Sequence, residues 1–311
     1  MAGTVWAGFS EVGGELIGFA WWIYVPVLLL TLVNYGLRYG KWHYLLGKLG
    51  VSVSHRDNVP IYLAGLAMVI SPGKIGELLK PYLVSKKTGA SMATTTPALV
   101  AERLTDGIAM LMLAALSVGT YAADQAWVLG LLAAVIVVGL AVLASKTVSL
   151  GIIRLVGRLP VVGRVAGKLE LMYSATRTCL APVPLVLTIL ASLVAWGAEC
   201  VGFLLVFEGL GVTASLDACT FLYSFATVAG GAMPGGLGVA DGALVGGTVT
   251  IFETSEAVAV TSALLIRVAT LWFGVVLGAF ALLRFDELAT TAWTGSFEGD
   301  AGAPDGEVVA E

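Results

Sequence analysis

Long apolar runs without charged side chains recur along the chain, and they constrain its fold more than any other feature. A helix needs about 20 mostly apolar residues to cross the roughly 30 Å of hydrocarbon in a bilayer. We therefore predict five full spans, at residues 16–37, 97–121, 126–145, 183–206 and 257–283. Because 58% of the chain is hydrophobic and only 12% is charged, we expect an all-α polytopic membrane protein.

Basic residues gather on one side of these predicted spans. One group follows the first span and another fills the linker 146–182: Arg38, Lys41, Lys48 and Arg56, then Lys146, Arg154, Arg158, Arg164, Lys168 and Arg177. The predicted loops on the other side contain acids but no Lys or Arg. Since Lys and Arg in short loops mark the cytoplasmic side, we predict a cell-membrane protein with its N-terminus outside and its C-terminus in the cytoplasm. The linker would form amphipathic interfacial helices or an ordinary basic loop.

Two further apolar stretches, at 58–85 and 216–253, each contain a Pro-Gly break. If 218–240 crossed the membrane, the uncharged return stretch 242–252 would span only about 17 Å as a helix. The positive-inside rule likewise favours entry and exit of 58–85 on one side. We therefore predict two re-entrant hairpins that approach from opposite faces. Their breaks would fall at Pro72, Gly73, Gly76, Pro234, Gly235 and Gly238.

The two breaks resemble each other in sequence, which predicts an internal repeat. "SPGKIGE" at 71–77 parallels "MPGGLGVAD" at 233–241. An arginine lies 31 residues after the proline of the first motif, at Arg103, and 33 residues after that of the second, at Arg267. A single Pro-Gly motif usually marks only a turn, but its recurrence favours an inverted repeat of the kind found in transporters. We predict one domain at 1–285, with repeats at about 16–121 and 183–283, and an acidic, disordered tail at 286–311.

Several charges fall inside the predicted membrane segments, where each costs about 2.5–3.5 kcal/mol at a helix centre. They are Lys74, Glu77, Lys80, Glu102, Arg103, Asp106, Glu199, Asp241 and Arg267. Glu102, Arg103 and Asp106 could bind substrate or form a structural ion network. Lys74 and Lys80 could bind substrate or extend to the cytoplasmic headgroups.

Arg267 has no acid close to it in its own predicted helix. Its partner must therefore come from another element, such as Asp241 or Glu199, or be a ligand. Glu199 could be that partner, or it could simply be protonated. The basic residues and the helix N-termini after each break suit a phosphate-bearing group, while Glu77, Glu102 and Asp241 suit a cationic headgroup, a proton or a co-ion.

Taken in order, these motifs resemble a known family over about residues 20–285. The segments that carry the resemblance are "SPGKIGE", "LKPYL", "ALVAERLTDG", "MPGGLGVADGALVGG" and "SALLIRVATLWFGVVLGAFAL". They are similar to the flippase-like domain family, which includes the transmembrane region of lysylphosphatidylglycerol synthases and the uncharacterised UPF0104 membrane proteins. The resemblance implies a lipid-handling protein that moves a headgroup between leaflets.

The resemblance also implies which positions matter. They are Pro72, Gly73, Gly76 and Glu77, Pro234, Gly235, Gly238 and Asp241, Glu102, Arg103 and Asp106, and Arg267. This chain departs from the family pattern at Asp241, where glutamate is usual, and at Ala240, where a polar or basic residue is common. Only 27 residues follow Arg284, so we expect no aminoacyl-transfer domain after it.

Three functions remain open at this point. The first is a lipid flippase with a polar groove between the hairpins, acting on membrane lipids that are anionic or polyprenyl-linked, with a separately encoded lipid-modifying enzyme as a possible partner. The second is an enzyme acting on a polyprenyl-phosphate-linked sugar, although the chain has only His43 and His55 and no HExxH motif. The third is a secondary transporter of a small solute.

We expect no metal, cofactor or nucleic acid to take part. GxxxxGK[ST], the motif that binds nucleotide phosphates, is absent from the chain. Enzymatic activity is therefore the weaker expectation, and the sequence leaves the oligomeric state open.

Overall fold

The computed structural model describes most of the chain between residues 2 and 283. The positions it leaves undescribed are 1, 122, 124–125, 148, 150, 152–165, 232 and 284–311. The predicted tail at 286–311 and about half of the predicted linker 146–182 therefore lie outside the described residues. Within the described part every regular element is helical, as the composition predicts.

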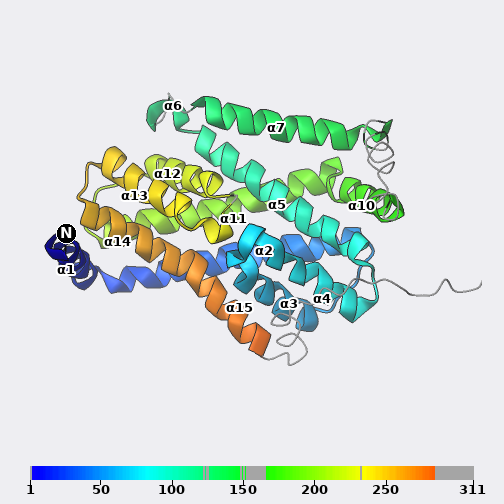
Figure 1. Ribbon diagram of the computed structural model, residues 1–311, viewed down its shortest axis with the longest axis horizontal. Helices are drawn as coiled ribbons and strands as arrows, with labels where there is room; N and C mark the ends of the chain where they lie inside the picture. The colour runs from blue at the N-terminus through cyan, green and yellow to red at the C-terminus, as the bar shows by residue number, and fades with distance from the viewer. Residues whose placement is uncertain are drawn as a thin grey trace, which may run out of the picture.

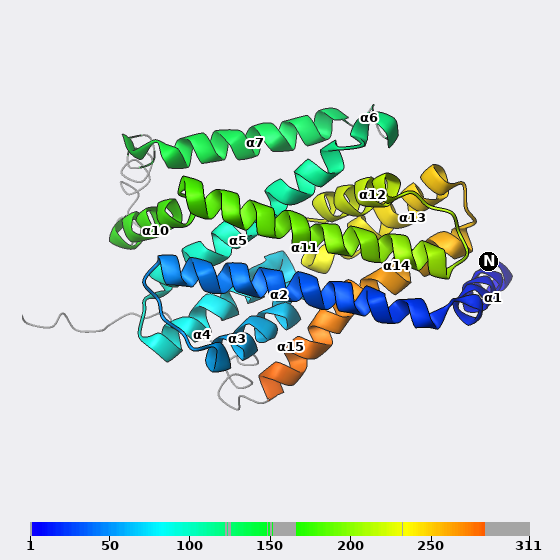
Figure 2. The same ribbon diagram turned by 180° about the vertical axis from the view of Figure 1, so that it is seen from behind.

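Eight helices outside the two regions with Pro-Gly breaks form most of an elongated bundle (Figure 1). They are α1 Ala2–Gly18, α2 Tyr24–Lys48, α5 Met92–Ala115, α7 Ala126–Ala144, α10 Ala166–Cys179, α11 Pro182–Gly209, α14 Glu256–Arg267 and α15 Phe273–Leu283. α2 and α11 lie side by side along the bundle (Figure 2), and their contact is the most extensive between any two helices of the described part. A π-helical turn, η6 Val268–Trp272, joins α14 to α15.

Three helices of the described part are long and apolar enough to cross a membrane. They are Pro182–Gly209, Pro234–Phe252 and Glu256–Leu283. A fourth is added if Ser10–Gly18 and Trp21–Lys48, bent by 73°, count as one span. The predicted spans at 183–206 and 257–283 match two of these. α7 has nearly the bounds of the predicted span 126–145, but only its stretch Ala133–Val142 is counted there, as a shorter apolar helix.

Two predicted spans have the wrong bounds. The stretch 16–37 is not one straight helix, because α1 ends at Gly18 and α2 begins at Tyr24, with Pro26 tolerated in its first turn. α2 then continues to Lys48, through residues that we had assigned to a cytoplasmic loop. The stretch 97–121 is covered by α5, which ends at Ala115, and by the short α6 Val118–Tyr121.

The two regions with Pro-Gly breaks each fold as a helical hairpin. The first hairpin consists of α3 His55–Ala67, η2 Met68–Ile70, η3 Pro72–Leu78 and α4 Leu79–Thr88. The second consists of α12 Leu216–Ala229, η5 Pro234–Gly236 and α13 Val239–Phe252. The return arm α13 is longer than the stretch 242–252 counted from the sequence, because it begins before Asp241.

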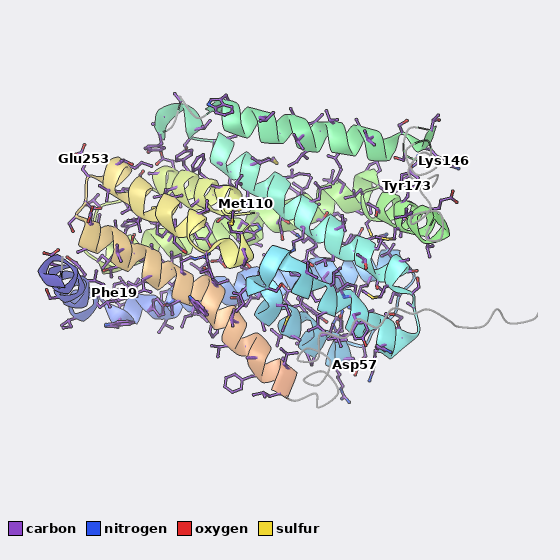
Figure 3. The ribbon with its side chains drawn as sticks, in the orientation of Figure 1. Phe19, Asp57, Met110, Lys146, Tyr173 and Glu253 are labelled. Carbon is purple, nitrogen blue, oxygen red and sulfur yellow. The ribbon has the colours of Figure 1, made fainter. Side chains whose placement is uncertain are left out.

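The hairpins extend from opposite ends of the bundle, and their tips meet in its middle (Figure 1). At the contact, a Cβ on Gly235 of η5 would lie 3.2 Å from Ile70 of η2. Gly235 also has a φ of 58°, a left-handed conformation that glycine adopts without strain. Figure 3 places Asp57 and Lys146 toward one end of the molecule and Glu253 at the other. The open ends of the hairpins therefore lie at opposite ends.

Close helix contact holds the first hairpin against α15. A Cβ on Gly278 would lie 2.5 Å from the backbone of Leu63 and of Ala67 in α3, so the two helices touch through their backbones. Small residues at such positions let helices approach closely within a membrane. The position of the first hairpin therefore depends on a glycine of the last helix.

We expect Gly278→Ala to destabilise the protein by about 1–3 kcal/mol, because an added methyl group would force α15 away from α3. Thermal unfolding of the purified protein in detergent measures the change. Gly197→Ala in α11 is the matched control, since nothing lies within 4 Å of its added Cβ. Equal melting temperatures for the two variants would contradict the close contact.

Candidate functional site

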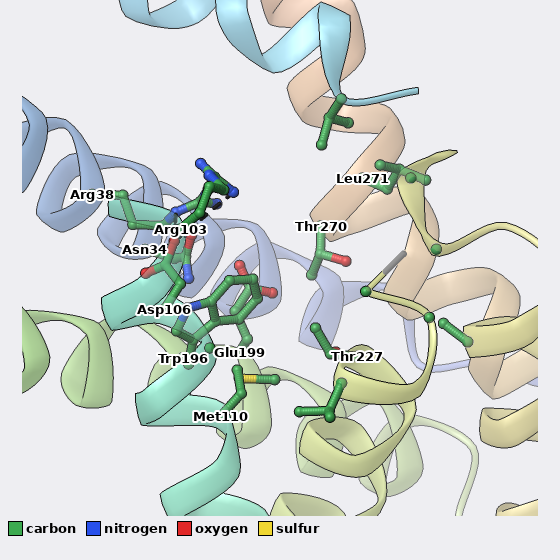
Figure 4. Close-up of a pocket in the computed structure, with 18 of the residues that line it drawn as sticks. Asn34, Arg38, Arg103, Asp106, Met110, Trp196, Glu199, Thr227, Thr270 and Leu271 are labelled. Carbon is green, nitrogen blue, oxygen red and sulfur yellow. Dashed lines mark ion pairs between the residues drawn. The ribbon is translucent and has the colours of Figure 1, made fainter. Parts of the chain in front are cut away.

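A cavity of about 470 Å³ lies where the two hairpin tips meet. Its walls come from α2, α5, α7, α11, both hairpins and the stretch from α14 to α15. Figure 4 shows Arg38, Arg103 and Asp106 grouped on one side of the space, with Thr270 and Leu271 across from them. Tips, helices and charges thus converge on a single site in the interior of the bundle.

Seven charged side chains form what we call the buried ion-pair cluster. Its members are Arg38, Lys41, Glu77, Lys80, Glu102, Arg103 and Asp106. Glu102 is fully buried and accepts a hydrogen bond from Lys80 Nζ at 2.6 Å and another from Arg103. Asp106, one turn further along α5, pairs with Lys41 and lies 3.4 Å from Arg38 Nε.

Arg103 connects this cluster to the cavity. Its Nε lies 3.1 Å from Glu77 Oε2, which ties α5 to the tip of the first hairpin. Its side chain is 31% exposed, whereas every other member of the cluster is at most 9% exposed. Four cations face three carboxylates in the cluster, so one positive charge is in excess. Arg103 is the member best placed to offer that charge to the cavity.

Lys80 does not extend to the headgroups, which was one of the two roles left open for it. Its side chain is only 3% exposed and its ammonium lies 4.6 Å from the ring centre of Trp42 and 5.0 Å from that of Tyr62. Gly65 makes room for it, because a Cβ there would lie 2.4 Å from Lys80 Cγ. Burial is tolerated because Glu102 and two aromatic faces compensate the charge. The side chain of Lys74 lies outside the described residues.

Arg267 pairs with Asp241 rather than with Glu199. Its Nε lies 2.8 Å from Asp241 Oδ1, and its guanidinium also donates a hydrogen bond to the carbonyl of Gly235. Asp241 Oδ2 accepts the backbone N–H of Gly238 at 2.9 Å. The shorter acid therefore reaches both partners here, and Arg267 fastens the break of the second hairpin.

Glu199 has a different environment from the other buried acids. It is 2% exposed, and no Lys or Arg of the described residues lies within 4.0 Å of its carboxyl oxygens. Its partner is the hydroxyl of Tyr223, which donates at 3.4 Å. Both residues line the cavity.

Three buried polar atoms along the cavity have neither a hydrogen-bond partner nor an ion pair within the described part of the chain. They are Asn34 Oδ1, Glu77 Oε1 and Trp196 Nε1. Buried polar atoms are normally satisfied, and those that are not mark places where water or a ligand can bind. In contrast, the described residues contain no group of three or more His, Cys, Asp or Glu arranged to hold a metal ion.

The contribution of α2 to the site was not predicted from the sequence. Arg38 and Lys41, which we had placed in a cytoplasmic loop, are 7% and 3% exposed and pair with the acids of α5. The loop assignment was wrong because a charge buried in a helix is stable once another element supplies its partner. Asn34, Arg38 and Lys41 recur at helical spacing after the apolar run, and this periodicity could have revealed a continuous helix.

Comparison with known proteins agrees with these motifs. The family model described as the lysylphosphatidylglycerol synthase TM region matches residues 2–278. The chain belongs to this family. It is also 26% identical over 300 residues to a "UPF0104 membrane protein" of Methanothermobacter thermautotrophicus, an alignment that covers 90% of this chain and 88% of that relative. No solved structure matches the chain. The resemblance predicted from the motifs is confirmed, and the chain is a membrane protein of this family.

We expect Lys41→Met to destabilise the protein by about 3 kcal/mol, because it leaves Asp106 buried without its nearest cation. The double variant Lys41→Met with Asp106→Asn should recover at least part of the loss, since it removes the unpaired charge as well. Thermal unfolding in detergent measures both. Failure of the second substitution to restore any stability would contradict the pairing.

The matched control is Lys87→Met, which breaks the exposed ion pair of 3.0 Å between Lys87 and Asp57. Hydrogen bonds from Lys87 and Ser54 lower the pKa of the Asp57 carboxyl at this exposed end of α3. Because exposed pairs are screened by water, this variant should unfold at nearly the same temperature as the wild type.

Proposed function

We propose that the protein is a lipid flippase-like transporter that moves a phosphate-bearing lipid headgroup through the cavity between the two hairpin tips. The observation that carries this proposal is the cavity itself, which lies at mid-bundle and is lined by an excess of positive charge. In this proposal the hairpins are re-entrant and related by inverted symmetry. The N-terminus lies outside the cell and the C-terminus lies in the cytoplasm.

The lengths of the hairpin arms support re-entry. The arms α3 and α12 have 13 and 14 residues, so each extends about 20 Å against the roughly 30 Å of hydrocarbon. The return arm reaches the length of a span only if it is counted from Pro234, and that count runs through the break, where Gly235 is not helical. Its continuous helix α13 has 14 residues. Backbone broken at this depth is stable only where protein or a polar cavity satisfies its N–H and C=O groups. Arg267 satisfies the carbonyl of Gly235 in this way. The Ser71 hydroxyl accepts the N–H of Gly76 at the other break.

The lining of the cavity supports a lipid over a water-soluble solute. Met110 and Leu111 of α5 and Val135 and Ile136 of α7 form an apolar part of the wall beside the charged cluster. A site with charged groups next to apolar ones suits a molecule with a polar head and hydrocarbon tails. A volume of about 470 Å³ is in the range of small-molecule sites and can hold a headgroup while the tails stay in the lipid.

The charge of the cavity supports an anionic or phosphate-bearing headgroup. The cluster has one positive charge in excess, and Arg103 is its most exposed cation. Guanidinium groups bind phosphate oxygens in a bidentate manner. The polyprenyl-phosphate enzyme is less favoured, since neither His43 nor His55 lines the cavity. The proposed partners are thus membrane lipids, together with a separately encoded enzyme that makes or consumes the transported lipid.

We expect the purified protein, reconstituted in phosphatidylcholine vesicles with a minor share of fluorescent phosphatidylglycerol, to move the probe between leaflets. Glu77→Ala and Arg267→Ala should each slow this movement by at least tenfold, which corresponds to about 1.4 kcal/mol. Glu77 holds Arg103 at the first hairpin tip, and Arg267 holds Asp241 and the carbonyl of Gly235 at the second. Glu208→Ala in α11 is the control, since Glu208 is exposed. Probe movement unaffected by both site variants would remove these residues from the site.

A second expectation concerns the charge of the lipid. Arg103→Gln removes the excess positive charge, so it should slow fluorescent phosphatidylglycerol more than the zwitterionic phosphatidylethanolamine. Dithionite quenching of the outer leaflet measures both rates. Equal slowing of the two lipids would show that Arg103 serves only to hold Glu77 and Glu102 in place.

A further inference from the structure

Glu199 is a buried acid that the proposed route for the headgroup leaves without a role. The other buried acids, Glu77, Glu102 and Asp106, each pair with at least one cation of the ion-pair cluster. Glu199 is equally buried in the middle of α11, yet no Lys or Arg of the described residues lies within 4.0 Å of it. An unpaired carboxylate in a low-dielectric interior is expensive, and such groups take up a proton instead.

The groups that face Glu199 from neighbouring elements are mostly neutral or already paired. Tyr35 and Arg38 of α2 interact with it electrostatically, Cys200 follows it in α11, and Tyr223 of α12 donates the hydrogen bond. Arg38 is held by Glu102 and Asp106, at 3.6 and 3.4 Å.

The remaining charged groups around the cavity come from α5, from the first hairpin and from α14. Arg103 and Asp106 of α5, and Glu77 and Lys80 of the first hairpin, belong to the ion-pair cluster. Arg267 of α14 is held by Asp241. Each cation near Glu199 therefore has another carboxylate as its partner in this state of the site.

The position of Glu199 allows exchange with whatever occupies the cavity. Glu199 lines the same cavity as Tyr223, Trp196 and Arg38. Figure 4 shows Glu199 beside Trp196, on the wall that carries Arg38. A charge that enters the cavity therefore acts on the carboxyl of Glu199 and on the cluster at the same time.

We propose that Glu199 binds a proton that travels with the headgroup, so that the protein is a proton-coupled symporter of an anionic lipid. This inference rests on the proposed function. When the anionic headgroup enters, its negative charge favours the neutral carboxyl, so a proton is taken from water on the entry side and forms an O–H bond with one carboxylate oxygen. When the headgroup leaves, the excess positive charge of the cluster favours the carboxylate, and the same proton is released to water on that side. Binding of the proton thus raises the affinity for the headgroup, and binding of the headgroup raises the affinity for the proton by the same factor.

The test uses proteoliposomes of phosphatidylcholine and phosphatidylglycerol with a tail-labelled fluorescent phosphatidylglycerol added only to the outer leaflet. Valinomycin and equal potassium on both sides hold the membrane potential at zero. With a gradient of one pH unit and one proton per lipid, we expect the probe to reach about a tenfold excess in the leaflet facing the alkaline side, because one pH unit corresponds to a factor of ten in the proton activity. Reversing the gradient should reverse the excess.

Glu199→Gln removes the proton site while keeping the shape of the side chain. This variant is expected still to move the probe, but the probe should reach equal amounts in both leaflets under either gradient. Glu199→Asp should restore a gradient-dependent distribution. Glu208→Gln, at an exposed position of the same helix, should behave like the wild type.

Tyr223→Phe supplies a second readout that does not depend on the folding of Glu199→Gln. It removes the hydrogen bond that stabilises the carboxylate, so the pH dependence of the translocation rate should shift to higher pH. A wild-type protein that moves the probe without an excess under either gradient overturns the coupling and leaves the proposed function standing. Three other results also overturn the coupling. They are a gradient-dependent excess in Glu199→Gln, a folded Glu199→Gln protein that moves no probe, and a pH dependence in Tyr223→Phe that does not shift. A wild-type protein that moves no probe at all overturns both proposals.

Discussion

The structure depends most on the pairing of two buried acids of helix α5 with cations. Glu102 and Asp106 are buried one turn apart, and their cations come from α2 and α4 as well as from α5 itself. Removing one partner of such a pair leaves an uncompensated charge, which costs far more than a missing surface ion pair. The network therefore fixes the relative positions of α2, α5 and the first hairpin, and it also sets the charge of the cavity wall.

An ion pair also holds the second hairpin in place, with fewer charged groups than in the cluster around α5. Arg267 pairs with Asp241 and donates to the carbonyl of Gly235, so one side chain satisfies both the charge and the broken backbone. Because the hairpin tips touch, an anion that draws Arg103 or Arg267 away from its acid would disturb the opposite tip as well. In the proposed function, this contact is a physical route by which headgroup binding would be linked to hairpin movement. Glu199 is the buried acid of the cavity that lies outside this set of pairs, which is why we assign it a different role.

Much of the architecture could be predicted from the chain alone. Apolar run length predicted the helices at 183–206 and 257–283, and the Pro-Gly motifs predicted where the two hairpins turn. The bend between α1 and α2 could not be predicted, because the apolar run continues through it without interruption. The partner of Arg267 was narrowed to two acids, but the choice of Asp241 depended on the return arm α13 bringing that acid within 2.8 Å.

The sequence by itself determined that the chain is a helical membrane protein of its family, because apolar run length and ordered motifs are local properties. It also indicated which acids and bases would be costly to bury. Only the tertiary structure decided how these charges are paired, since most of the pairs join different elements, such as Lys41 of α2 with Asp106 of α5. For the same reason it alone decided that Arg38 and Lys41 are interior residues and that Glu199 has no cation beside it in the described part of the chain.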